Sequence, residues 1–253
     1  KPVTTIKGGF VYKTKELPGG YVEKVKAWYC AKGYSQVEGL HYKSSFAPVA
    51  SATAVRTIMY IACEYGWPLH HLDVSTAFLN ADIEPDIELY IDPPPCITLK
   101  PGERLRLRKG LYGLVQGSAR WAMLLAETLR RLGFKRCHSD SSVYSRDDHR
   151  GKTMMAVVVD DFCLTANSID AVNCAKAEIK AIWDCTDFDD LDWFIKIHVQ
   201  RRKSTGRMRL SQKTYIQGMV DRYLTRRGRT FTKIDTPMDP KLRLSTSMSP
   251  VSE

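Results

Sequence analysis

The sequence lacks both a hydrophobic run long enough to cross a membrane and the pattern of a secretory signal peptide. No run of apolar residues is longer than that of residues 154–159, whereas a membrane-spanning helix needs roughly 20 apolar residues. No basic and then apolar leader follows Lys1, and the first residue is not methionine. We therefore expect a piece of a longer, soluble intracellular protein, located in the cytoplasm or the nucleus, with no membrane partner.

Cysteine pairs at the spacing of a redox motif or a zinc site are also missing. The seven cysteines are an odd number, include no C-x-x-C pair, and lie partly inside apolar segments, as Cys163 does. This usage is typical of reduced, intracellular proteins rather than of disulfide-stapled secreted domains. Cys137 and His138 have no partners at zinc-ligand spacing, so they do not predict a zinc site.

Several enzyme classes are excluded because their motifs are absent. The chain has no G-x-S-x-G elbow, no G-x-x-x-x-G-K-[ST] phosphate loop, no G-x-G-x-x-G after a strand and no H-E-x-x-H pair. His70 and His71 form a doublet in a strand-like run, where successive side chains point to opposite faces, so at most one can face a site. We favour a structural histidine there over a metal ligand.

Positive charge, in contrast, is abundant and unevenly distributed. The chain has 38 Lys and Arg against 28 Asp and Glu, a net charge of +10. Residues 196–243 hold 14 basic against three acidic residues, residues 101–136 hold nine against two, and residues 140–192 hold 12 acidic against five basic. Solvated helix faces would explain any single block. Three blocks of alternating sign favour a basic rim around an acidic pocket, which suits a polyanion beside a cation site.

The basic stretch after residue 196 is the expected nucleic-acid surface. Its candidate contacts are Arg201, Arg202, Lys203, Arg207 and Arg209. Because neutralising phosphates releases condensed counterions, we expect the affinity to fall steeply with salt.

The periodicity of apolar residues predicts an α+β fold. Amphipathic helices are expected after the N-cap candidates Ser51, Ser118, Ser168 and Ser211, each with an apolar stripe that we take as a core face. Strand-like runs cover residues 69–74, 87–91, 154–159, 162–165 and 193–199. Helices and strands mix without regular βαβ alternation, so we expect an antiparallel sheet with helices on one face.

Three aspartates stand out against these apolar runs. Asp160 and Asp161 interrupt what otherwise resembles a buried β-hairpin, and Asp73 lies at the end of a second apolar strand. An exposed hairpin tip is the ordinary explanation of an Asp-Asp pair. If the two strands pair, however, three carboxylates converge, and such a set binds hard cations such as Mg²⁺. Two such ions support in-line phosphoryl transfer, so nucleotidyl transfer follows as a hypothesis.

A series of motifs in order resembles the reverse transcriptase domain of copia-type LTR retrotransposons, a part of the Pol polyprotein. The resemblance covers about residues 3–245. Its motifs are VKAWYCAKGYSQVEGLHYKSSFAPVA, LHHLDVSTAFLNADI, RLRKGLYGLVQGSARW, VVVDDFCLTA, LSQKTYI and TPMDPKLRLS. The resemblance implies a right-hand polymerase with fingers at residues 1–67 and 93–115, a palm at 68–92 and 116–199, and a basic, thumb-like segment with a tail at 200–253.

The resemblance also implies roles for particular residues. Asp73, Asp160 and Asp161 match the catalytic aspartates that bind two Mg²⁺, or Mn²⁺, and Val74 would offer a backbone carbonyl near the metals. The remaining matches concern the dNTP: Phe78 is the aromatic gate against a ribose 2′-OH, Gln116 lies beside the nucleotide, and Lys26 and Lys32 lie near triphosphate or template. The implied partners are an RNA template, a DNA primer and a dNTP. No oligomeric state is implied.

Four positions depart from the family pattern. Val158 replaces the tyrosine of the YVDD box, Trp28 replaces an arginine, Val115 replaces a lysine, and Lys196 replaces the glycine of an FLGI motif. Loss of Arg or Lys near a triphosphate removes charge-assisted hydrogen bonds that Trp or Val cannot replace. Two functions therefore stay open: an RNA-directed DNA polymerase, or a decayed or domesticated fragment that binds nucleic acid or protein.

Overall fold

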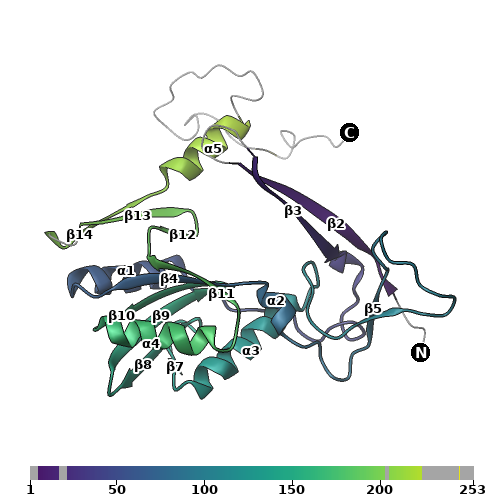
Figure 1. Cartoon of the computed structure of the whole chain (residues 1–253), viewed down its shortest axis with the longest axis horizontal. Helices are drawn as coiled ribbons and strands as arrows, with labels where there is room; N and C mark the ends of the chain where they lie inside the picture. Colours follow the sequence, from purple (N-terminus) through teal and green to yellow (C-terminus); the bar gives the residue numbers. More distant parts are fainter. Residues whose placement is uncertain (1–4, 17–21, 203–204, 224–244, 246–253) are drawn as a thin grey trace.

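The computed structural model describes residues 5–16, 22–202, 205–223 and 245. Its centre is a six-stranded antiparallel sheet with the strand order β11-β4-β10-β9-β8-β7, shown in Figure 1. The strands are β4 (Leu69–Val74), β7 (Lys135–Arg136), β8 (Val143–Asp148), β9 (Gly151–Val158), β10 (Asp161–Ala166) and β11 (Cys185–Asp190). The predicted α+β class and the antiparallel sheet are confirmed.

The central strands are apolar on both faces. Leu72 and Phe162, which pair across β4 and β10, are fully buried on one face. Cys163 and Ala156, which pair across β10 and β9, are fully buried on the other. Strands buried on both sides form near-continuous apolar runs, which explains why these strands were recognisable in the sequence.

Helices cover both faces of this sheet, so the expected one-sided arrangement is wrong. α3 (Gly117–Arg131) and α4 (Ile169–Lys180) share a core with the face that carries Leu72 and Phe162. α1 (Ala52–Glu64) packs on the opposite face, against Cys163 and Ala156. Figure 1 shows α1 and α4 on opposite sides of the strands. A second helical layer is needed because the central strands have no polar face to present to water.

Two of the predicted helix starts are confirmed and one is corrected. The Ser51 hydroxyl accepts the Ala54 amide, and the Ser168 hydroxyl accepts the Ala171 amide, both at 3.1 Å, as N-caps do. α3 begins one residue before the predicted cap Ser118, because the carbonyl of residue 116 already accepts the amide of residue 120 at 2.9 Å.

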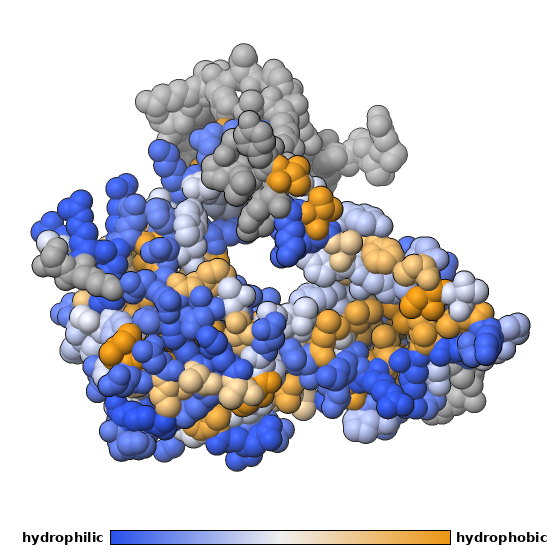
Figure 2. Space-filling view, in the orientation of Figure 1, coloured by the Kyte–Doolittle hydropathy of each residue, from blue (hydrophilic) through white to orange (hydrophobic). Residues whose placement is uncertain are grey.

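A smaller part of the molecule lies beside the main sheet. β1 (Thr5–Ile6), β5 (Leu89–Ile91) and β6 (Leu105–Leu107) form a three-stranded sheet. β2 (Gly8–Glu16) and β3 (Val22–Ala31) form a long two-stranded hairpin, which is followed by the short helix η1 (Gly33–Ser35). Figure 1 shows this hairpin projecting away from the six-stranded sheet, and Figure 2 shows the surface hollowed between the two parts.

The predicted strand at 193–199 is instead a tight hairpin. β12 (Trp193–Phe194) and β13 (Ile197–Arg202) are separated by Ile195 and Lys196, whose φ values of 42° and 66° reverse the chain. β13 then pairs with β14 (Arg207–Ser211). Phe194, Ile197 and Val199 pack on the same core as α1.

The last described helix, α5 (Lys213–Tyr223), does not bury its apolar stripe. Ile216 and Tyr223 are each 53% exposed and Met219 is 40% exposed. The expectation that this stripe is a core face is therefore wrong. Periodic spacing of apolar residues shows which face of a helix is apolar, but not whether another element covers it.

Two sequence-based expectations concern the chain as a whole. All seven cysteines carry free thiols. Among the described helices, none combines the length and the apolar character needed to cross a bilayer.

Candidate active site

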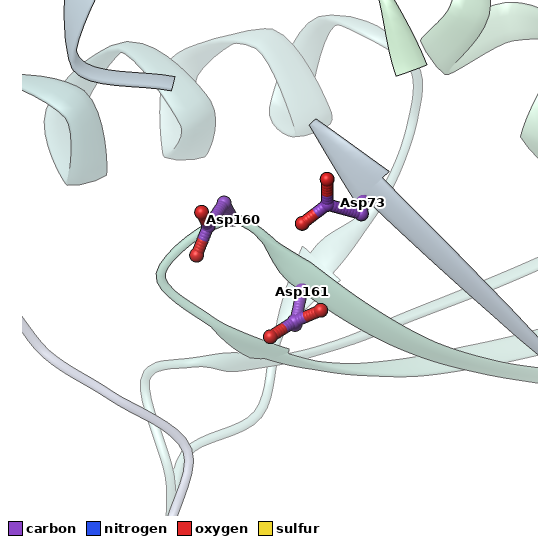
Figure 3. A group of neighbouring side chains, drawn as sticks. All are labelled: Asp73, Asp160 and Asp161. Carbon is purple, nitrogen blue, oxygen red and sulfur yellow. The ribbon is translucent and has the colours of Figure 1, made fainter. Parts of the chain in front are cut away.

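Three carboxylates gather where β4 meets the turn between β9 and β10. Asp73 in β4 pairs directly with Asp161, the first residue of β10, and Asp160 lies in the turn. Each side chain offers an oxygen atom, and these atoms all lie within 4.8 Å of one another. Figure 3 shows the three side chains together at this corner of the sheet. The predicted convergence of two acid-bearing strands is confirmed.

The turn that carries Asp160 has a strained backbone. Val159 has a φ of 62°, which a β-branched residue adopts only where its surroundings enforce it. Two hydrogen bonds hold the turn: the Trp121 indole donates to the Val159 carbonyl at 2.7 Å, and the Val74 amide donates to the Asp160 carbonyl at 2.9 Å. The structure thus fixes this carboxylate from both neighbouring elements, α3 and β4.

The environment of the carboxylates opposes their negative charge. Partial burial and the charges of Asp160 and Asp161 raise the pKa of Asp73, while His71 and Lys26 act in the opposite direction. Partial burial and the charge of Asp161 also raise the pKa of Asp160. Like charges directly opposite each other across a strand pair destabilise a sheet. A cation among these oxygens would remove that cost.

The donor set fits a divalent metal. Carboxylate oxygens are hard ligands that suit Mg²⁺ or Mn²⁺, and all three donors here are of this kind. The half-buried setting and the mutual repulsion of the carboxylates point to a positive partner.

His71 is a residue of the site that sequence analysis did not assign. Its Nε2 lies 2.7 Å from a carboxylate oxygen of Asp161, and its ring stacks on Phe188 at 4.7 Å and meets Phe194 edge-on at 5.6 Å. The expectation that only one histidine of the doublet could face a site agrees with this arrangement, because His70 is buried on the opposite face. The available signal was its position two residues before Asp73, on the same face of β4.

The predicted gate residue Phe78 lies in the short helix α2 (Ala77–Asn80), which follows β4. Its ring contacts that of Tyr112 edge-on, with 5.1 Å between the centroids. Burial, followed by the charges of Asp160 and Asp73, raises the pKa of Tyr112. Sequence analysis did not single out Tyr112.

The two lysines expected near the nucleotide differ in position. Lys26 is exposed on β3, with its Nζ 5.7 Å from the ring centroid of Trp28. Its charge partly offsets the rise in the pKa of Asp73. Lys32 is exposed just after β3, beside Gly9. Contact of either lysine with a nucleotide stays a prediction.

Gln116 lies in the interior of the fold. Its side chain is buried, with 1% exposed, and both ends of its amide are occupied. Its Oε1 accepts a hydrogen bond from Gln36 at 2.8 Å, and its Nε2 donates to the carbonyl of His41 at 2.9 Å. The described structure uses this amide to join two segments of the chain, and the place of Gln116 beside a nucleotide stays a prediction.

The basic surface after β12 also divides into two kinds of residue. Arg201 is half-buried and donates to the carbonyls of Ala62 and Trp67, both at 2.6 Å. These bonds hold its guanidinium against the fold, and its contact with nucleic acid stays a prediction. Lys203 lies outside the described residues. The other expected contacts, Arg202, Arg207 and Arg209, are exposed.

The three exposed arginines share the outer face of the β13–β14 pair. Arg202 pairs with Arg207, and Arg209 pairs with Gln200. The alternate pairs, such as Val199 with Leu210, belong to the face that packs toward α1. Because paired residues of a sheet lie on the same face, these arginines form one positively charged surface.

Comparisons with known proteins agree with the motifs. Residues 1–237 match the family model described as reverse transcriptase (RNA-dependent DNA polymerase). The chain is 31% identical over 245 residues to the retrovirus-related Pol polyprotein from transposon RE1 of Arabidopsis thaliana, covering 96% of this chain and 16% of that protein. The polyprotein from transposon RE2 of the same plant is 32% identical over 248 residues, with 96% and 17% covered.

More distant similarities extend this comparison. The Pol polyprotein from transposon TNT 1-94 of Nicotiana tabacum is 26% identical over 250 residues, with 98% of this chain and 18% of that protein covered. The chain therefore spans less than a fifth of the length of these three relatives. A solved structure of apo telomerase from Candida Tropicalis, truncated from the C-terminal domain, aligns with 83% of this chain and 56% of that chain, at a TM-score of 0.40 and 6% identity.

Proposed function

This chain belongs to the reverse transcriptase (RNA-dependent DNA polymerase) family, and we propose that it is the RNA-directed DNA polymerase domain of a copia-type Pol polyprotein. The resemblance inferred from the motifs is confirmed. The proposed activity rests on one observation: three carboxylates from two paired strands lie within 4.8 Å of one another. The reaction would join a dNTP to the 3′-OH of a DNA primer on an RNA template.

Asp73, Asp160 and Asp161 would hold two Mg²⁺ ions, or Mn²⁺ in their place, with the Val74 carbonyl nearby. Such ions, when bound, lower the pKa of the attacking hydroxyl and neutralise the leaving pyrophosphate. The role of the protein is to hold the carboxylates in fixed positions. The hydrogen bonds from Trp121 and Val74 to the turn support this role, since preorganised charges need no rearrangement during reaction.

The nucleotide would enter between the β2–β3 hairpin and the carboxylates. Phe78, held edge-on against Tyr112, would meet the sugar and exclude a 2′-OH. Lys26, exposed on β3, would approach the triphosphate.

The primer and template would lie across the hollow seen in Figure 2. The outer face of β13–β14, with Arg202, Arg207 and Arg209, supports backbone contacts to phosphates. Contacts of this kind respond to the shape and charge of a nucleic acid and carry little base specificity.

The proposed right-hand subdivision assigns the described elements to three parts. The six-stranded sheet would be the palm, the β2–β3 hairpin with the β1-β5-β6 sheet the fingers, and β13, β14 and α5 the start of a thumb. The core that α1 shares with the six-stranded sheet supports placing this helix with the palm, whereas the boundary expected from the sequence assigned residues 1–67 to the fingers.

Extension of a DNA primer on an RNA template, with dNTPs and Mg²⁺ or Mn²⁺, tests the proposed function. We expect wild-type extension, and only background from a double variant with Asp160→Asn and Asp161→Asn. Asp147→Asn is the matched control, because Asp147 is exposed on β8 of the same sheet. Equal background from wild type and double variant would exclude polymerase activity and leave a nucleic-acid-binding or protein-binding fragment.

A further inference from the structure

The end of β3 is joined to the segment that precedes α3 by unusually close backbone contacts. The Ala31 amide donates to the Tyr112 carbonyl at 2.8 Å. A Cβ atom added at Gly33 would lie 2.1 Å from the carbonyl oxygen of Gly113, and one added at Gly113 would lie 2.0 Å from that of Ala31. Only glycine permits this approach at both positions. The hairpin and the segment before α3 are therefore fixed to each other.

A series of hydrogen bonds between side-chain amides extends from this junction into the interior. The Gln36 Oε1 accepts the Val115 amide at 2.8 Å, while its Nε2 donates to the Gln116 Oε1 at 2.8 Å. The Gln116 Nε2 in turn donates to the His41 carbonyl at 2.9 Å. Each amide has one orientation that satisfies both of its neighbours, because a flipped amide would place like groups together. The two glutamines therefore act as a single unit.

His41, at the far end of this series of hydrogen bonds, is also held in place. The His41 ring is buried, with 3% exposed, and its Nδ1 accepts the Val37 amide at 2.8 Å. This bond assigns the ring proton to Nε2 and closes the loop that follows η1. The His41 carbonyl, which receives the Gln116 amide, is thus held by the same loop that carries Gln36.

Two parts of the candidate active site begin at this junction. The Gln116 carbonyl accepts the Arg120 amide at 2.9 Å and so begins α3, the helix from which Trp121 holds the turn of Asp160. Tyr112, whose carbonyl receives the end of β3, packs on Phe78. A shift of the junction would move the gate and the helix together.

We propose that Gln36 is a positioning residue of the active site, which acts through Gln116 to fix the gate Phe78 and the Asp160 turn relative to the β2–β3 hairpin. The proposal rests on the proposed polymerase function and deepens it. It also gives Gln116 the role of a structural link, in place of a direct nucleotide contact. The predicted effect is on the fit of the incoming nucleotide, because hairpin and gate would enclose it from two sides.

Primer extension by Gln36→Leu, Gln116→Leu and the double variant tests this role. For each, kcat and KM are measured separately with a dNTP and with the matching rNTP. We expect Gln36→Leu to raise the dNTP KM and to lower the discrimination against the rNTP, each by roughly tenfold, with a smaller change in kcat. The double variant should resemble either single variant, because the two amides form one unit. Gln217→Leu, which removes an exposed amide on α5, is the matched control.

The outcomes separate the two proposals. Unchanged KM and discrimination in a folded Gln36→Leu, or additive effects in the double variant, would overturn the positioning role while the polymerase stands. No extension by the wild type would overturn the proposed function and the positioning role with it. Should Gln36→Leu fail to fold, Gln36→Glu keeps an acceptor for the Val115 amide and replaces the donor to Gln116 by a carboxylate oxygen. The same shift in KM and discrimination is then expected, and its absence would overturn the positioning role.

Discussion

Single arginines in this molecule perform two different tasks that look alike in the sequence. Arg201 and Arg202 are adjacent in one basic run, yet successive residues of a strand point to opposite faces. The first donates to the carbonyls of Ala62 and Trp67 at the end of α1, and the second is exposed on the outer face of β13. Charge counting alone could not separate them, because it ignores the face that each strand buries.

We predict that Arg201→Ala lowers the free energy of unfolding by about 2 kcal/mol, since two carbonyls lose charge-assisted partners. Arg209→Ala, on the exposed face, should change it by less than about 0.5 kcal/mol. Urea denaturation of both variants measures the difference. Equal stability of the two variants would contradict the assignment of Arg201 to the interior.

The buried Lys176 makes the free energy of unfolding depend on pH in the acidic range. Its Nζ lies 2.9 Å from carboxylate oxygens of both Asp187 and Asp189. Although burial opposes the effect, the hydrogen bond from Lys176 lowers the pKa of Asp187. A carboxyl whose folded pKa is depressed stabilises the fold above its ordinary pKa of 3.8, and this contribution is lost as the pH falls below that value.

We predict that Lys176→Met lowers the free energy of unfolding at pH 7 by about 3 kcal/mol, because it leaves a carboxylate without its buried partner. The difference from wild type should shrink as the pH falls below 4, where the carboxyls take up protons. Denaturation curves across this range measure it. Lys180→Met is the matched control, since the Lys180 side chain is 44% exposed and lies 3.4 Å from Asp187. A difference that does not depend on pH would contradict the role of the pair.

Among single residues of the site, those whose charge is costly to bury were the most predictable from the sequence. The three aspartates were predictable because charges rarely interrupt apolar strands without a partner. The residues that hold this site in place were not predictable. Trp121 belonged to an ordinary apolar stripe, and Tyr112 and Gln36 lay in segments without periodicity. Such residues act through hydrogen bonds and ring contacts between distant segments, which leave no local pattern.

At the scale of elements, the β12–β13 hairpin shows how a departure from the family pattern affects the backbone. Lys196, which replaces the glycine of the FLGI motif, has a φ of 66°, in the region that favours glycine. Its Nζ lies 4.6 Å from the ring centroid of Tyr215 on α5. The side chain therefore compensates in part for the strain of its own backbone.

We predict that Lys196→Gly is more stable than Lys196→Ala by about 1 kcal/mol, because only alanine pays the cost of a left-handed backbone. Both variants lose the contact with Tyr215, so their difference isolates the backbone. Thermal unfolding of the two variants is the measurement. Greater stability of the alanine variant would mean that this turn does not have the described conformation.

Elements were predictable from the sequence where both faces are buried. The run at 69–74 coincides with β4, because its apolar residues pack on two layers. β8, β11 and the β2–β3 hairpin were not predicted, since their strands carry many polar and charged residues. These segments are strands because they pair with neighbouring strands, and the apolar pattern of one segment does not encode such pairing.

At the scale of the whole molecule, the acidic block at residues 140–192 has more than one use. Asp160 and Asp161 belong to the carboxylate cluster. Asp148 and Asp187, in the same block, are paired with Arg150 and Lys176. A count of acids therefore overstates the charge available for a cation, because part of it stabilises the fold.

We predict that binding of an RNA–DNA hybrid weakens steeply with salt, with a slope of about 0.9 per phosphate neutralised. Replacing Arg202, Arg207 and Arg209 together by alanine should lower this slope by roughly three. Fluorescence anisotropy at several salt concentrations measures both. A flat salt response of the wild type would exclude the polyanion surface, and an unchanged slope in the variant would place that surface elsewhere.

The proposed polymerase requires a divalent cation held by Asp73, Asp160 and Asp161. Anomalous diffraction from crystals soaked in Mn²⁺ tests this directly. We predict a manganese peak among the three carboxylates, and its loss when Asp73 is changed to Asn. Carboxylates that lie apart, or manganese bound only elsewhere in the crystal, would contradict the central claim.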